Sequence, residues 1–358
     1  MKPHIPFTGS GFESAASRSL KEAADRQNIS ERMLSYGIRF LDAVTFGIWP
    51  DDLVILGAPS GSGKTQLCVN IALHNILKGK RVHMIALEAA KNEIERRMKY
   101  GLLSDLFYQD KARPKIGEPL SYAKWYLGRY KAFIKPYEDY ANMHMADFEN
   151  FFTFYKDKEF TEHTMQDALI GAADDTDLFL IDHIHYFDFT NESENKSIKL
   201  IVQKARYLTQ VLEKPIILVS HLRKRDKLHS DLVAGQEDFH GSSELIKAAT
   251  TGIAIAPGEP VPFHADDDGE DRGRRFYTYM RVNKCRVDNP GTGYVARAIF
   301  DAGKRAYEGD FELGRLVKGG KEWVGLSGEE IPPAVRSENE RLKQLERGGS
   351  SGAGSHGA

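Results

Sequence analysis

The sequence predicts an α/β protein with a mostly parallel sheet flanked by helices and with antiparallel strands toward its C-terminus. Short apolar segments recur along the chain, and segments with helical apolar spacing separate them. Alternation of this kind is typical of parallel sheets, because each parallel strand needs a crossover connection. The first apolar segment also runs into a glycine-rich turn that is followed by a helix, which is the order found around phosphate-binding loops.

The phosphate-binding loop reads APSGSGKT and follows the expected strand Leu53–Leu56. Its glycines allow backbone N–H groups to turn inward, and the helix that follows (Thr65 to about Leu77) points its positive end at a polyphosphate. Lys64 is expected to reach the β- and γ-phosphates, and the Thr65 hydroxyl to ligate Mg²⁺. A chance glycine-rich turn would lack this strand–turn–helix context. The sequence therefore predicts that ATP or another nucleoside triphosphate binds with Mg²⁺ to Ser60, Gly61, Ser62, Gly63, Lys64, Thr65 and Gln66.

Composition limits the remaining possibilities. The 358 residues are 41% hydrophobic, which is enough for one large or two modest domains. A net charge of -2 gives no overall attraction to nucleic acid or membrane, so such binding would need a local patch. The two cysteines, Cys68 and Cys285, form no C-x-x-C pair, and no apolar run approaches the roughly 18 residues of a membrane span. We expect a soluble, cytoplasmic protein without a membrane partner.

Three regions follow from the pattern: an N-terminal arm and linker helix (1–35), an ATPase domain (36–325) and a flexible polar tail (326–358). The helix expected at Phe12–Arg26 has a thin apolar face, so it either docks on a neighbouring subunit or stays solvated. The segment 104–160 is expected to contribute helices that cover the sheet, around Tyr122–Ile134 and Met145–Phe154, although its aromatic residues could instead form a base-stacking platform. Further strands are expected at Val82–Leu87, Asp177–Asp182, Pro215–Ser220, Thr251–Ile255, Phe276–Cys285 and Tyr294–Phe300, and further helices at Lys91–Leu103, Ile198–Leu212 and near Ser242.

Three polar residues end predicted parallel strands and so belong at the edge where ligands bind in α/β sheets. Asp182 is the candidate carboxylate on the metal side, unless it is an ordinary residue at a strand end. Glu88 is the candidate general base, with an exposed surface carboxylate as the alternative. His221 is placed to sense the γ-phosphate, although a single histidine is more often structural.

Other charged clusters are less specific. The basic residues Arg223, Lys224, Arg225 and Lys227 come directly after the strand that ends in His221, so they either contact nucleic-acid phosphates or form a solvated loop. His183 and His185 share one face but have no third ligand nearby in the sequence, which argues against zinc. The run Asp266–Asp268 departs from calcium-loop spacing and is expected to be a solvated hairpin tip.

Together these motifs resemble the RecA-like ATPase domain of ring-forming replicative helicases of the DnaB, Twinkle and bacteriophage primase-helicase type. The resemblance extends from about Tyr36 to Glu308. It rests on the lead-in GIRFLDAVTFGIWPDDLVIL, on MIALE and its catalytic glutamate, on FLIDHIHYF as the Walker B strand, on VSHLRKRDK, and on HGSSELIKAAT as the segment that lines the central channel. By this resemblance His240, Gly241 and Lys247 join the basic residues as DNA-binding residues.

The segment MRVNKCRVDNPGTG (Met280–Gly293) resembles the family's Lys-x-Arg hairpin. The resemblance implies that Lys284 and Arg286 reach the nucleotide of the neighbouring subunit, with Arg286 as the arginine finger, and that Phe300 stacks on the base. It further implies a homo-oligomer in the form of a hexameric ring, ATP-driven movement on single-stranded DNA, duplex unwinding and a replication partner protein. The alternative is a switch or scaffold ATPase of the RecA or KaiC kind, acting without unwinding in phage or plasmid replication, repair or defence.

Overall fold

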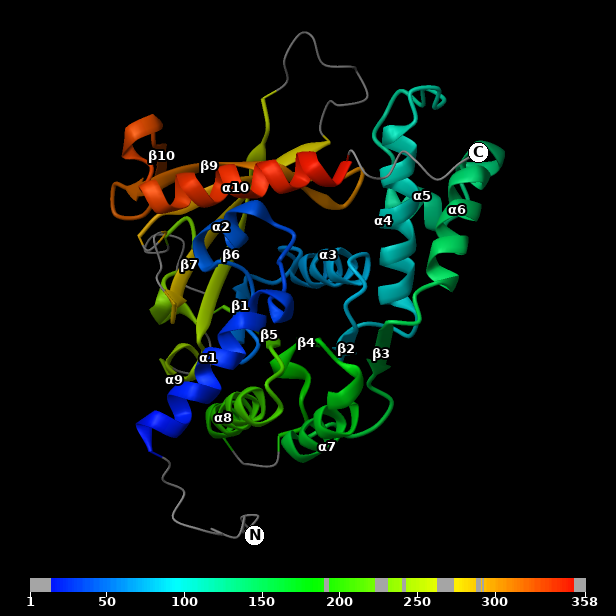
Figure 1. The fold of residues 1–358 in the computed structure, drawn as a ribbon. Coiled ribbons are helices and arrows are strands. Elements are labelled where there is room, and N and C mark those ends of the chain that lie inside the picture. Colours follow the sequence, from blue (N-terminus) through cyan, green and yellow to red (C-terminus); the bar gives the residue numbers. More distant parts are fainter. Residues whose placement is uncertain are drawn as a thin grey trace. The chain divides into compact units, whose positions relative to one another are not determined.

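A computed structural model describes residues 14–189, 193–222, 231–239, 243–262, 274–287, 291 and 293–350 (Figure 1). The chain divides into two compact units, residues 1–33 and 34–358. The first contains helix α1 (Ala15–Arg32), which begins where the Ser14 side chain accepts a hydrogen bond from the Ser17 backbone, and which buries none of its side chains. All the elements described below belong to the second unit.

The second unit is organised around one sheet with the strand order β10-β9-β8-β7-β6-β1-β5-β4-β2-β3 among the described residues. Neighbouring strands from β6 to β3 are parallel, and those from β6 to β10 are antiparallel. This confirms the predicted fold class. The strands are β1 (Leu53–Ala58), β2 (Val82–Ala86), β3 (Phe151–Tyr155), β4 (Leu178–Asp182), β5 (Ile216–His221), β6 (Thr251–Pro260), β7 (Arg275–Cys285), β8 (Val295–Asp301), β9 (Ala306–Val317) and β10 (Glu322–Gly325).

Helices cover both faces of the parallel strands, which explains why these strands are apolar throughout rather than alternating. On β1, Val54 and Leu56 face a core shared with α2 (Arg39–Thr45) and α3 (Lys64–Ile76). Leu53 and Ile55 face the opposite core, which includes residues of α7 (Glu162–Ala172), α8 (Glu194–Leu212) and α9 (Ser243–Ala248). Both faces are buried, so the loops at the strand ends remain as the place for a site.

A third core lies in the segment that was expected to cover the sheet. Helices α4 (Glu93–Gln109), α5 (Tyr122–Tyr126) and α6 (Lys135–Ala146), with the short 3₁₀ turn Lys131–Ile134, pack on one another through Tyr100, Phe107 and Trp125. The helix expected at Met145–Phe154 is wrong in its second half, because residues 151–155 form strand β3 beside β2. The sequence FFTFY is rich in aromatic residues, which favour strands over helices.

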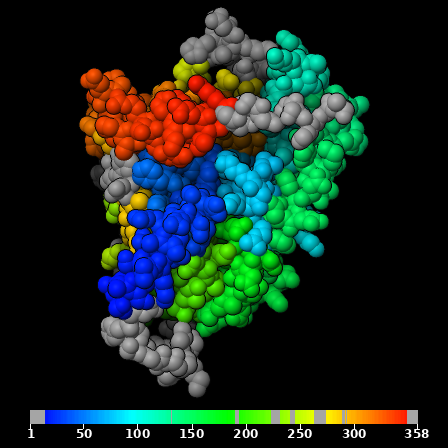
Figure 2. Space-filling view, viewed as in Figure 1, coloured from blue at the N-terminus to red at the C-terminus, as the bar shows by residue number. Residues whose placement is uncertain are grey.

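The C-terminal region also differs from the prediction. Residues 333–350, which we expected in a flexible tail, form α10 (Pro333–Ser350); it lies against α2 and is drawn in red at the surface in Figure 2. Val335 is buried in the first core, and Arg39 of α2 forms ion pairs with Asp310 and Glu346. A few apolar contacts on one face are thus enough to hold a mostly charged helix in place. None of the helices in the described ranges is long and apolar enough to cross a membrane.

Candidate nucleotide-binding site

The phosphate-binding loop connects β1 to α3 as the sequence predicts. Gly61 and Gly63 have φ values of 76° and 89°, in the left-handed region that glycine adopts without strain. Gly63 is the N-cap of α3, whose first residue is Lys64. The loop therefore presents the N-terminus of a 13-residue helix, with its free N–H groups, to any anion bound there.

Lys64 is held inside this loop. Its Nζ donates hydrogen bonds to the carbonyl oxygens of Ala58 (3.3 Å) and Pro59 (2.9 Å), and lies 3.1 Å from Nδ1 of His221. Burial lowers the pKa of Lys64, while the carboxylates of Asp182 and Glu88 oppose that shift. The strand ends of β1 and β5 are paired, Ala58 beside His221, so the predicted sensor and the phosphate-binding lysine face the same space.

Thr65 and Asp182 form the second part of the site. The Thr65 hydroxyl donates a 2.6 Å hydrogen bond to Oδ2 of Asp182, whose other oxygen is buried and has no hydrogen-bond partner among the described residues. Burial raises the pKa of Asp182 to about 6. Mg²⁺ prefers hydroxyl, carboxylate and water oxygens as ligands, so a buried carboxylate with an unsatisfied oxygen beside the Thr65 hydroxyl fits this ion.

Glu88 lies just beyond the end of β2 and is oriented by two neighbours. Its Oε2 lies 3.0 Å from Nε2 of His183, and its Oε1 accepts a 3.2 Å hydrogen bond from the hydroxyl of Tyr186. Burial, together with the neighbouring His221 and His185, lowers the pKa of His183 to about 3. His183 is therefore a neutral, buried contact of Glu88, and its ring lies 4.2 Å from that of His221.

Two adjoining cavities open at the loop. One, of about 390 Å³, contains the phosphate-side residues Ser60, Gly61, Gly63, Lys64, Thr65, Gln66, Glu88, Ala89, Glu93, Arg97, His221 and Arg305. The other, of about 600 Å³, is lined by aromatic and small residues that include Tyr122, Phe276, Tyr277, Phe300 and Tyr307. Phe300, predicted as the base-stacking residue, lines the aromatic cavity with its ring 5.2 Å from that of Tyr307. Gly61, Gly63, Gln66 and Arg305 border both cavities, which together have room for a triphosphate and its base.

The sequence reasoning missed Arg97, Tyr122 and Arg305. Arg97 could have been found, because it follows Glu88 on the next helix, and that helix starts at the same edge of the sheet. Arg305 and Tyr122 carry no such signal. They reach the site only through the antiparallel pairing of β8 and β9 and through the third core.

Lys284 and Arg286 lie far from the phosphate-binding loop of their own chain. The register Thr251–Cys285 places the end of β7 beside the start of β6, and β6 starts where β1 starts. The loop is at the other end of β1, six residues away at about 3.3 Å each, or roughly 20 Å. Here Nζ of Lys284 donates to the carbonyl oxygens of Ile246 (2.8 Å) and Lys247 (2.9 Å), and Arg286 pairs with Asp51 at 3.1 Å.

The predicted DNA-binding residues are mostly outside the described residues. Arg223, Lys224, Arg225, Lys227, His240 and Gly241 all fall there. Lys247 is described; it is exposed on α9, at the same edge of the sheet as Lys284.

Residues 34–105 match the family of the DnaB-like helicase C-terminal domain. The replicative DNA helicase DnaB of Pasteurella multocida (strain Pm70) is 22% identical over 240 residues, which are 66% of this chain and 49% of that protein. The chain thus spans about half the length of this curated relative. A solved structure of a DnaB-like replicative helicase, determined to show its interactions with primase, has a TM-score of 0.59 at 14% identity over 88% of this chain and 68% of its own. A solved ATPase domain has a TM-score of 0.58 at 14% identity over 88% and 100%.

Proposed function

We propose that this chain, a relative of the DnaB-like helicases with a RecA-like fold, hydrolyses ATP between neighbouring copies of itself and uses that energy to move along single-stranded DNA. Its relation to this family supports a helicase-type ATPase. The observation that carries the proposal is the convergence of Lys64, Glu88 and the Thr65–Asp182 pair on one cavity next to an aromatic one.

Each of these residues has a role that its surroundings support. Lys64 and the loop N–H groups bind the β- and γ-phosphates of ATP. Thr65 and Asp182 hold Mg²⁺, which when bound neutralises charge on those phosphates. Glu88, oriented by His183 and Tyr186, positions the attacking water and accepts its proton. His221 contacts the γ-phosphate side and connects it to the segment that follows β5.

The site needs a cation from another copy of the chain. Arg286 is exposed and lies about one strand length from its own loop, so it is available to a neighbour rather than to its own nucleotide. A ring of copies packed head to tail would supply one Arg286 to each nucleotide, and an arginine finger is worth about 10³–10⁵ in hydrolysis rate.

Mixing two inactive variants tests this arrangement. Arg286→Ala and Glu88→Gln should each abolish turnover while nucleotide binding remains. In a mixture, the intact loop of an Arg286→Ala subunit can meet the intact finger of a Glu88→Gln subunit, so part of the ATPase activity should return. Mixing Glu88→Gln with Lys64→Ala is the matched control, because both changes lie on the loop side and no complete site can form. Equal silence of both mixtures would contradict a shared site.

A second test concerns DNA. Steady-state ATP hydrolysis should rise with an unstructured single-stranded oligonucleotide, and the stimulation should weaken with salt if phosphate contacts carry it. Unwinding of a forked duplex should then depend on Glu88. Turnover that ignores the oligonucleotide would favour the switch or scaffold alternative. The solved relative's interactions with primase support a replication partner protein for this chain as well.

A further inference from the structure

Arg305 has a position that none of the roles above uses. It borders both the phosphate cavity and the aromatic cavity, and its guanidinium lies over the ring of Tyr122, 4.6 Å from the centroid. No carboxylate among the described residues forms an ion pair with it. The nearby acid, Glu93, is already paired with Arg97 at 2.5 Å. A half-buried guanidinium without an acidic partner at the border of a cavity is a site for an anion.

We propose that Arg305 binds the α- and β-phosphates of the nucleotide held by its own chain, and that Tyr122 holds its guanidinium in place. This inference rests on the proposed function, because it assigns a further ligand of the same nucleotide. The location follows from the two cavities. Glu88 lines only the phosphate cavity, whereas Arg305 also borders the aromatic one. Arg305 therefore lies on the base side of the phosphates.

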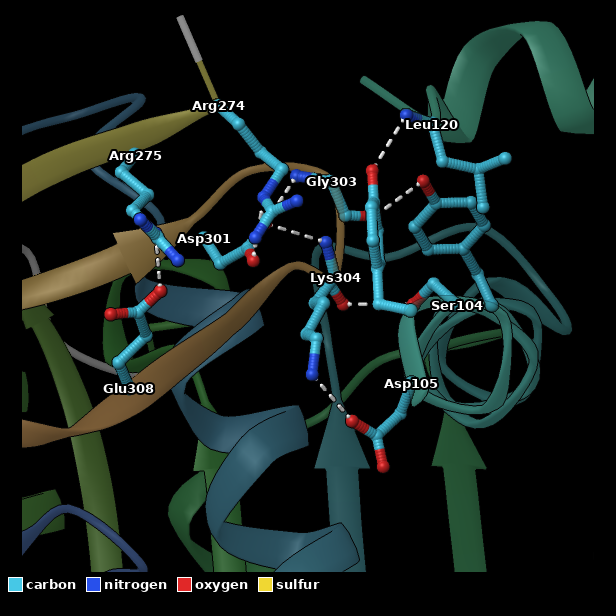
Figure 3. A network of polar contacts seen from close by, with 11 residues as sticks. Ser104, Asp105, Leu120, Arg274, Arg275, Asp301, Gly303, Lys304 and Glu308 are labelled. Carbon is cyan, nitrogen blue, oxygen red and sulfur yellow. Dashed lines mark hydrogen bonds and ion pairs between the residues drawn. The ribbon is translucent and has the colours of Figure 1, made fainter. Parts of the chain in front are cut away.

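The turn that carries Arg305 is fixed from within, as Figure 3 shows. The carboxylate of Asp301 accepts hydrogen bonds from the backbone nitrogens of Gly303 (2.9 Å) and Lys304 (3.0 Å). The same carboxylate forms a 3.0 Å ion pair with Arg274, and both side chains are buried. Asp301 thus organises the turn in the way that an Asx turn does, with a buried charge pair behind it.

The turn is also attached to two helices. From α4, the hydroxyl of Tyr100 donates to the Gly303 carbonyl oxygen (2.7 Å), and Oγ of Ser104 donates to that of Lys304 (3.2 Å). From α3, the side chain of Gln66, next to the phosphate-binding Thr65, donates to the carbonyl oxygen of Arg305 itself (3.0 Å). The backbone of Arg305 is therefore positioned relative to the phosphate loop before any ligand binds, which reduces the ordering cost of binding.

Tyr122 is positioned as well. Its hydroxyl accepts a 3.3 Å hydrogen bond from Nε of Arg96, and its ring is packed edge-on against that of Tyr100 at 5.3 Å. The pKa of Arg305 is lowered by burial and by the positive charge of Arg97, and an anion placed between the two cations would offset both effects.

The test is equilibrium binding of ATP, ADP and adenosine to the full chain and its variants. Arg305→Gln keeps the length of the side chain and removes its charge, so ATP and ADP should each bind about tenfold or more weakly, the loss of one charge-assisted contact. Adenosine should bind as before, and Arg305→Lys should recover part of the loss. Arg129→Gln changes an exposed arginine of the same helical segment and serves as the matched control. Melting temperatures check that each variant is folded.

The outcomes separate this inference from the proposed function. Unchanged ATP and ADP affinity in Arg305→Gln would overturn the inference and leave the proposed function standing. Weakening of ATP alone would place Arg305 at the γ-phosphate and overturn its assignment here. Equal weakening of adenosine would show that Arg305 shapes the base pocket instead. A wild-type chain that binds neither ATP nor ADP would overturn both proposals.

Discussion

The phosphate side of the nucleotide site and its aromatic side are assembled from different parts of the molecule. The phosphate side comes from the ends of neighbouring parallel strands: β1 leads into the loop, β2 to Glu88, β4 to Asp182 and β5 to His221. The aromatic side comes from antiparallel strands and from α5, with Phe276, Phe300 and Tyr122 as examples. Backbone pairing within one sheet places the first set, whereas the second depends on contacts between separate elements.

This difference predicts how each side responds to mutation. Parallel strands buried on both faces fix their ends rigidly, so polar residues there can be exchanged with little loss of fold and a large loss of chemistry. The turn Asp301–Arg305 is held by polar contacts, among them the buried Arg274–Asp301 pair. Changes there should affect stability and nucleotide affinity before they affect the chemical step.

The largest effect is expected on the phosphate side. Glu88→Gln should lower ATP hydrolysis by about 10²–10⁴ without weakening ATP binding, since it removes a general base and leaves the phosphate ligands intact. Glu149→Gln, an exposed carboxylate at the opposite end of β2, is the control and should hydrolyse ATP normally. Single-turnover hydrolysis and ATP binding measured on the same samples separate the two quantities. Loss of binding equal to the loss of rate would contradict a purely chemical role.

On the aromatic side, Asp301→Asn should act mainly on stability. Asparagine can still accept the hydrogen bonds from Gly303 and Lys304, but it leaves the buried Arg274 without its counter-charge. Breaking a buried ion pair in this way costs about 3–5 kcal/mol in the free energy of unfolding. Urea denaturation gives this value. A change below about 1 kcal/mol would mean that the pair is solvated and that the turn does not depend on it.

The same division decides what the sequence could predict. Lys64, Thr65 and Asp182 were found because their chemistry and their strand context are encoded within a few residues of each other. Glu88 was found because a strand that follows the phosphate-binding helix ends there. Arg305 was not found, because the contact that places it joins Gln66 to a residue 239 positions away. No local pattern reports such a pairing.

The errors in the fold have a similar origin. Strand β3 was taken for the end of a helix because its aromatic residues alternate too weakly between exposed and buried to indicate a strand. Helix α10 was taken for a tail because it is mostly polar. Its place against the core rests on Val335 and on ion pairs of Arg39 with Asp310 and Glu346, residues far apart in the chain. In both cases tertiary contacts decide an ambiguous local sequence.

A smaller effect is expected from the titration of Asp182. Its pKa of about 6 in the folded chain lies above its ordinary value of 3.8, so the folded state binds this proton more tightly than the unfolded state does. Without Mg²⁺, stability should therefore fall as pH rises from about 4 to about 6, by at most about 1.4 kcal/mol per pH unit. Asp182→Asn should remove this part of the slope. Asp42, whose pKa burial also raises to about 6, contributes equally in both proteins and cancels in the comparison. Identical slopes would contradict the assignment.

The smallest effect is expected at the other end of the same turn, where Lys304 pairs with Asp105 at 2.9 Å and the Asp105 carboxylate is about half exposed. Asp105→Asn should lower the free energy of unfolding by no more than about 1 kcal/mol, because water solvates both partners once the pair is broken. Added salt should shrink even this difference, since screening weakens an exposed pair far more than the buried Arg274–Asp301 pair. Denaturation of both variants at low and high salt therefore measures the contrast within one turn. If Asp105→Asn proved as costly as Asp301→Asn, the turn would depend on its attachment to α4 as much as on its buried charge.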